Sequence, residues 1–247
     1  MKLKFFHHEF EQEVRNQLSV FDRPITESDA KMVEELDLTN FSFRDEDVET
    51  LCYFNNLKML GIEMGTKDLE FWNHFPELED LYWCCWGFAV DFNVFKNMKN
   101  LTTLCVSGGD YSDIEYKNLD ALKELKKLNF LELHEFGPVD IAPIGQMPWL
   151  KSFALRYSSQ VKNIDTIGTM NFLENLYLDG LYVENLDFLD SLPDSIRLEM
   201  CGIEIYGCKD VDVKKWLRFT NRDICEIKTK DQWWDYIDLS PLEAESK

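Results

Sequence analysis

The sequence is poor in glycine, proline and basic residues. It has 11 Gly, 7 Pro and 26 Lys plus Arg among 247 residues, against 46 Asp plus Glu. So little glycine and proline is untypical of disordered or linker-rich proteins. The formal charge of −20 disfavours nucleic acids and anionic membranes as partners. A neutral or basic protein partner suits this charge better, although solubility alone would also explain it.

Long apolar runs are missing too. Charged residues interrupt every hydrophobic segment, so the sequence predicts no transmembrane helix. The opening MKLKFFHHEF lacks the apolar stretch and cleavage site of a secretion signal. The seven cysteines are an odd number without the spacing of a disulfide framework. We therefore expect a cytoplasmic protein, the alternative being a secreted or surface adhesin whose export signal lies outside this sequence.

Motifs of catalysis and metal binding are absent. The sequence has no Gly-rich phosphate loop, His-Glu-x-x-His helix or Gly-x-Ser-x-Gly elbow. Adjacent Cys84 and Cys85, and adjacent His7 and His8, lack metal-ligand spacing. We predict a non-enzymatic protein without metal or cofactor.

A cysteine enzyme is the alternative to that prediction. The C-terminal segment contains two cysteines and nearby acids but no histidine: Cys208, Cys225, Asp223 and Asp231. A Cys-His nucleophile would have to use His74 or His134 from earlier in the chain.

Leucine is abundant, and it recurs in a pattern. The motif Leu-x-x-Leu-x-Leu, with other apolar residues allowed, starts at residues 33, 57, 78, 101, 128, 150 and 173, and a weaker copy contains Ile196 and Leu198. Steps of 21 to 27 residues between these starts are typical of leucine-rich repeats. Each copy predicts a short strand that pairs in parallel with the next.

Between the strands, apolar residues recur three apart, as in Ile164, Ile167 and Met170. This period predicts 3₁₀ turns, where residues i and i+3 eclipse, rather than long α-helices. The predicted fold class is an α/β solenoid. It is a right-handed, curved leucine-rich-repeat solenoid with a concave parallel sheet and a convex side of 3₁₀ or irregular turns. The longest step, from 101 to 128, predicts that residues 107–118 bulge outward.

Both ends of a solenoid need a cap. We divide the chain into a helical N-terminal cap at 1–31, a solenoid of about eight repeats at 32–203, and a mixed C-terminal cap at 204–247. In the first cap, Phe10, Val14 and Leu18 share one helix face. In the last, residues 210–219 predict a short helix. Residues 224–239 predict a strand followed by an aromatic turn or helix. Its Trp233, Trp234 and Tyr236 should cover the last repeat, the alternative being an exposed binding patch.

On two segments the chain resembles bacterial leucine-rich-repeat proteins of the internalin-like, short-repeat class. They are the entry segment, residues 10–18 and 24–40, and units such as IDTIGTMNFLENLYLDGL, residues 164–181. The resemblance implies a curved solenoid that binds a protein ligand on its concave face without enzymatic activity. The chain departs from the class where a buried asparagine is usual, for example at Phe136 and Ser158.

Residues between the inward leucines should point to the concave face. There, acids outnumber bases and aromatic residues lie among them, as in protein interfaces. A solvated acidic face with aromatics placed by chance is the other interpretation. The ten candidate protein-binding residues are Glu63, Tyr82, Phe130, Glu132, His134, Arg156, Tyr177, Asp179, Arg197 and Glu199. We expect a monomer that acts as a regulator, an adaptor or an immunity-type inhibitor.

Overall fold

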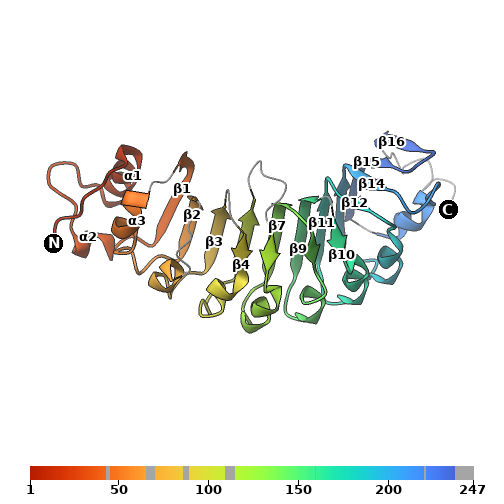
Figure 1. Cartoon of the computed structure of the whole chain (residues 1–247), viewed down its shortest axis with the longest axis horizontal. Coiled ribbons are helices and arrows are strands. Elements are labelled where there is room, and N and C mark those ends of the chain that lie inside the picture. Colours follow the sequence, from red (N-terminus) through yellow and green to blue (C-terminus); the bar gives the residue numbers. More distant parts are fainter. Residues whose placement is uncertain are drawn as a thin grey trace.

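The chain forms an elongated arc with its N-terminal and C-terminal elements at opposite ends (Figure 1). The computed structural model describes residues 1–42, 45–64, 70–85, 89–108, 115–158, 160–219 and 221–236. The buried core runs along the arc between a sheet and a row of turns. No helix in these ranges is both long and apolar enough to cross a membrane.

One parallel sheet follows the length of the arc. Its successive strands are β1 (Glu35–Ser42), β2 (Met59–Glu63), β3 (Asp80–Cys84), β5 (Thr103–Ser107), β7 (Phe130–Phe136), β9 (Ser152–Ser158), β11 (Asn175–Asp179), β13 (Arg197–Cys201) and β15 (Asn221–Lys228). The strands pair in register, so that Leu36 lies opposite Leu60, and Leu60 opposite Leu81. These leucines are fully buried. The predicted solenoid is therefore confirmed, and β15 extends the sheet past residue 203.

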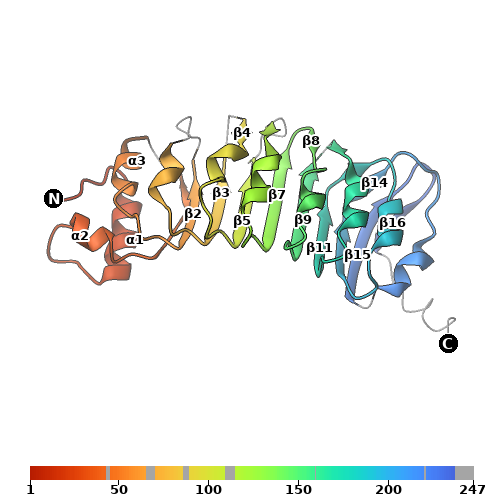
Figure 2. The same cartoon turned by 90° about the horizontal axis from the view of Figure 1, so that it is seen from below.

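The convex side consists mainly of 3₁₀ turns, which lie in front of the sheet in Figure 2. They are η1 (Phe71–His74), η2 (Phe92–Phe95), η3 (Leu119–Glu124), η4 (Ile144–Gln146), η5 (Ile164–Thr169), η6 (Asp187–Ser191) and η7 (Val213–Arg218). Ile164 and Ile167 are both buried, as the eclipsed i and i+3 positions of such a turn require. The first repeat has a short α-helix instead, α3 (Asp45–Leu51).

Short strands at the sheet-to-turn corners were not predicted from the sequence. They are β4 (Val90–Asp91), β6 (Tyr116–Lys117), β8 (Val139–Asp140), β10 (Val161–Lys162), β12 (Tyr182–Val183) and β14 (Ile203–Ile205). They pair in parallel as β4 with β6, β8 with β10, and β12 with β14. Two or three residues are too few to show an alternating pattern, so these strands depend on their neighbours in space.

The predicted bulge at 107–118 is wrong at its two ends. Ser107 closes β5, and Tyr116 in β6 is buried. The Tyr116 hydroxyl donates a hydrogen bond to the Val106 carbonyl at 3.0 Å, which ties the segment to the core. Residues 109–114 lie outside the described residues.

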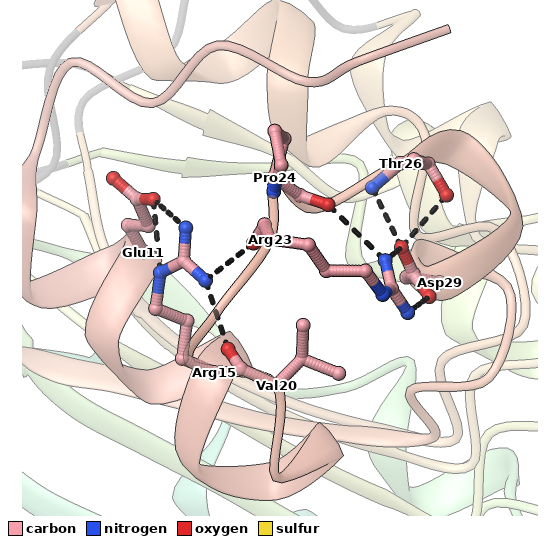
Figure 3. A network of polar contacts seen from close by, with 7 residues as sticks. All are labelled: Glu11, Arg15, Val20, Arg23, Pro24, Thr26 and Asp29. Atoms are coloured by element: carbon pink, nitrogen blue, oxygen red, sulfur yellow. Dashed lines mark hydrogen bonds and ion pairs between the residues drawn. The ribbon is translucent and has the colours of Figure 1, made fainter.

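The N-terminal cap consists of α1 (His8–Leu18) and α2 (Glu27–Ala30). Phe10 and Val14 are buried and Leu18 is partly buried, as predicted. Polar contacts hold the loop between the helices (Figure 3). Arg23 makes two 2.7 Å hydrogen bonds to the Asp29 carboxylate, which also accepts one from the Thr26 amide. The entry to the solenoid is thus fixed by both apolar and ionic contacts.

The C-terminal end differs from the prediction in one element. The strand within 224–239 is present, but β16 (Trp233–Tyr236) follows it as an antiparallel strand rather than a turn or helix. Trp233 is 55 % exposed, so it does not cover the last repeat. In the 210–219 helix, Trp216 is buried as predicted. The side chains of Val213, Leu217, Trp234 and Tyr236 lie outside the described residues.

Candidate protein-binding surface

The register of the sheet arranges the concave side chains in three columns. Column 1 contains Glu35, Met59, Asp80, Thr103, Phe130, Ser152, Asn175, Arg197 and Asn221; column 2 contains Asp37, Gly61, Tyr82, Cys105, Glu132, Ala154, Tyr177, Glu199 and Asp223; column 3 contains Glu63, Cys84, Ser107, His134, Arg156, Asp179 and Cys201. The apolar residues between the columns point to the core. The alternation of a strand thus separates the core from the candidate surface.

All ten candidate residues fall in these columns. Phe130 and Arg197 lie in column 1; Tyr82, Glu132, Tyr177 and Glu199 lie in column 2; Glu63, His134, Arg156 and Asp179 lie in column 3. Tyr82 stands out as 43 % exposed. The structure therefore places the candidates on one continuous face, spread over strands β2 to β13.

An ion-pair network occupies the centre of this face. Arg156 Nε lies 3.0 Å from Glu132, and its Nη1 lies 3.5 Å from Asp179. The same guanidinium lies over the Tyr177 ring, 5.8 Å from its centroid. The side chain of Glu132 is only 22 % exposed. Glu132 points to the concave face as the strand pattern predicts, but it is paired with Arg156 and mostly shielded from solvent.

Acidic groups at the N-terminal end of the face have no such partner. Asp37, Glu63 and Asp80 form no ion pair with any cation among the described residues, whereas Glu199 pairs with Arg197. Asp37 instead accepts hydrogen bonds from the Thr39 amide and hydroxyl, at 3.1 and 2.6 Å. Three of the four column acids from β7 onward therefore contact an arginine, whereas the column acids of β1–β3 form no ion pair among the described residues.

A cleft of about 180 Å³ lies next to this acidic end. It is lined by Thr39, Tyr82, Cys105, Ser107, Glu132 and His134, among others. Burial, with smaller contributions from Glu132 and Asp80, raises the pKa of the Cys105 thiol to about 12. The cleft therefore has an apolar floor, an exposed aromatic ring at one wall and carboxylates around it.

Comparison with solved structures identifies this architecture. Internalin C2 of Listeria monocytogenes has a TM-score of 0.63 at 15 % identity, over 90 % of this chain and 93 % of that one. Internalin F of the same organism has 0.61 at 16 %, over 91 % and 71 %. The Arabidopsis receptor kinase HAESA, solved with the peptide hormone IDA and the co-receptor SERK1, has 0.57 at 17 %, over 80 % and 35 %.

The fold is an internalin-like leucine-rich-repeat solenoid. No protein-family model and no curated protein sequence matches the chain. At such low identity the likeness concerns the fold, and the surface of the solenoid has its own chemistry. Phe136 and Ser158, where the resemblance led us to note the missing asparagine, are both buried.

One constellation on the solenoid has the residue types of a catalytic triad. Ser107 Oγ lies 3.1 Å from His134 Nδ1, and Glu135 Oε2 lies 3.4 Å from the same nitrogen. In a catalytic triad the nucleophile contacts one ring nitrogen of the histidine, and the acid contacts the other ring nitrogen. Both partners here share Nδ1, so the relay geometry is not formed.

The cysteine alternative requires a Cys-His pair that the solenoid keeps apart. His134 in β7 and Cys225 in β15 are four strands apart in the sheet, or roughly 19 Å at about 4.8 Å per strand. His74 ends η1 on the convex side. Cys225 instead adjoins Cys201, whose pKa burial raises to about 12. Nor do the described residues include a cluster of three His, Cys, Asp or Glu suited to a metal.

Sequence reasoning missed three features of the surface. The ten candidates do not include Asp37 and Asp80, which lie in the same columns, or Gly61 between Asp37 and Tyr82. A second cavity of about 510 Å³ lies at the sheet-to-turn corner beside Tyr182 and Tyr206. These rings stack with their centroids 4.6 Å apart. The cavity depends on β12 and β14, so only the strand pairing revealed it.

Proposed function

We propose that this solenoid is a non-catalytic interaction module that holds a protein ligand on its concave face. The observation that carries the proposal is the convergence of all ten candidates on three adjoining columns. Exposed Tyr82 and half-buried Tyr177 lie there among charged groups. Aromatic side chains ringed by charge supply affinity and orientation in protein interfaces.

The fold supports the same function. A curved solenoid presents an extended concave surface, and repeat proteins use such surfaces for binding. HAESA, which has the same fold, was solved with a peptide hormone and a co-receptor. The charge of −20 favours a neutral or basic ligand for the present chain. Regulator, adaptor and inhibitor roles all use such a surface.

Site-specific photo-crosslinking tests this proposal. A photoreactive amino acid replaces Tyr82 or Tyr177 on the concave face, or exposed Asp165 on the convex side as the control. Each variant is irradiated in a lysate of the source organism, and the products are identified by mass spectrometry. We expect one protein to be joined at both concave positions and not at Asp165. A product formed only at Asp165, or none at either tyrosine, would contradict the proposal.

A further inference from the structure

The cleft beside Tyr82 and the unpaired acids of β1–β3 together indicate what kind of group the surface binds. We infer that this cleft receives a single lysine or arginine side chain of the partner protein. The inference rests on the proposed protein-binding function and names the chemistry of its anchor residue.

The shape of the cleft suits one long side chain. Its volume of about 180 Å³ is far below that of a drug-sized ligand pocket. Tyr82 and Cys105 offer apolar surface to the methylene groups of a basic side chain, which bury their stems while the charge stays near water. The Tyr82 ring is also a face over which a cation is attracted. Neutral Cys105 adds no competing positive or negative charge to the floor.

The charges determine the sign of the anchor. Glu132 in the cleft wall is already paired with Arg156. Asp80 on the strand of Tyr82, Glu63 on β2 and Asp37 on β1 have no cationic partner among the described residues. Glu63 lies opposite Cys84 of the cleft lining, and Asp37 accepts a hydrogen bond from Thr39 of the lining. These carboxylates therefore lie along the β1–β3 edge of the cleft. A cation there gains their attraction, and an acidic side chain would be repelled.

Gly61 lets the Asp37 carboxylate lie toward the cleft. A Cβ atom at this position would lie 2.8 Å from Asp37 Oδ1 and 3.0 Å from Thr39 Cγ2. Column 2 therefore has a gap between Asp37 and Tyr82, where every neighbouring strand carries a side chain. The Asp37 carboxylate leans over this gap. Asp37 and Thr39 occupy the space that a side chain at residue 61 would fill, so the Asp37 carboxylate lies over β2, toward Tyr82.

The opposite end of the face does not offer the same site. Its cavity of about 100 Å³ includes Arg156, Asp179 and Glu199. Arg156 contacts Asp179, and Glu199 contacts Arg197, so two of its three carboxylates already have a cation, and Asp223 is the third. An incoming lysine would also meet the positive charge of Arg156 in the lining. The free-energy gain is therefore larger at β1–β3.

Selection from a displayed library of random peptides tests the inference on the full chain. We expect the enriched peptides to share one Lys or Arg flanked by apolar residues. The selected peptides are then resynthesised with norleucine for lysine or citrulline for arginine, which keep the length and remove the charge. This replacement should weaken binding about tenfold or more, as loss of an interface anchor does.

Variants of the protein locate the binding. Tyr82→Ala and Glu63→Gln should each weaken binding of the selected peptide about tenfold. Glu174→Gln is the matched control, because it also removes one negative charge but at a pair with Lys151 outside the cleft. It should change the affinity less than about threefold. Circular dichroism and melting confirm that each variant is folded.

Three outcomes would contradict the inference that the cleft receives a lysine or arginine side chain. They are enriched peptides without a basic residue, binding that survives both Tyr82→Ala and Glu63→Gln, and no enrichment at all. None of them would contradict the proposed function, because the crosslinking experiment uses the intact partner and does not depend on the charge of its anchor residue. Crosslinks at Tyr82 and Tyr177 together with failure of the peptide selection would show that the solenoid binds a protein by another anchor.

Discussion

At the scale of single residues, neighbours along one strand have opposite roles. Leu131 and Leu133 are fully buried, while Glu132 between them lines the concave cleft. The pleat of a strand directs successive side chains to opposite faces. Substitutions one position apart should therefore affect different properties.

Leu131→Ala tests the buried half of this alternation. Removing a side chain with no exposed surface leaves a cavity in the core, and we expect a loss of about 2–5 kcal/mol in the free energy of unfolding. Glu132→Gln is the control, because it keeps the shape, leaves Arg156 in contact with Asp179 and creates no cavity in the core, so its loss should be smaller. Urea denaturation followed by circular dichroism measures both. Equal losses in the two variants would show that the strand register is wrong.

Gly180 is a second residue whose role is structural. It has φ of +59°, and a Cβ atom there would lie 2.4 Å from Cδ1 of Tyr157. Left-handed backbone recurs at the matching positions of neighbouring repeats, in Glu135, Tyr157, Gly202 and Glu226. We expect Gly180→Ala to destabilise the protein by about 1–3 kcal/mol, from backbone strain together with the clash.

A double-mutant cycle separates those two causes. In a Tyr157→Ala background the clash is removed and only the strain at φ of +59° is left. Gly180→Ala should therefore cost less in that background than in the wild type. Denaturation of the four proteins measures the difference. The same cost in both backgrounds would show that Tyr157 does not contact residue 180.

At the scale of elements, the helical cap is held by a buried carboxylate. Arg23, hydrogen-bonded to Asp29, is the main cause of a pKa for Asp29 well below its usual range, and Thr26 adds to the effect. A carboxylate with a lowered pKa in the folded state stabilises the protein above its unfolded pKa of about 3.9. That stabilisation is lost as the pH falls through the folded value.

Asp29→Asn should therefore lower the free energy of unfolding most near neutral pH. The difference in unfolding free energy between wild type and variant should shrink as the pH falls below about 4, because the wild type then loses the Asp29 contribution. Urea denaturation across this pH range measures it. Asp165→Asn, at an exposed position in η5, is the control and should show little difference at any pH. A pH-independent effect of Asp29→Asn would contradict the ionic role.

At the scale of the whole molecule, an extended arc with a charge of −20 repels itself. The repulsion is strongest at low ionic strength, where the Debye length is about 30 Å at 0.01 M against about 8 Å at 0.15 M. Raising sodium chloride between these values should raise the melting temperature by roughly 2–4 °C, equivalent to about 1 kcal/mol. Scanning calorimetry measures this.

A variant with fewer exposed acids provides the control for the salt effect. Glu35→Gln, Asp165→Asn and Asp223→Asn together remove three negative charges from exposed positions. This variant should melt higher than the wild type at low salt and respond less to added salt. An equal response in both proteins would mean that self-repulsion does not limit the stability of the solenoid.

The sequence by itself determined the solenoid, the buried residues of each repeat and the concave position of every candidate. These follow from local periods: two for the strands, three for the turns and about 23 for the repeat, as in the start positions 150 and 173. Because the buried leucines fix the register of each strand, the residues between them, such as Tyr82 and Glu132, must point to the concave face.

Only the tertiary structure decided which acids are balanced, where the cleft lies and how the C-terminal segment folds. The pairing of Arg156 with both Glu132 and Asp179 joins three strands, and the Asp37 carboxylate lies over Gly61 of the adjacent strand. The short strands such as β12 and β16 likewise form through their partners. Contacts between repeats do not appear in the pattern of any single repeat, because they depend on which side chains the register places opposite one another.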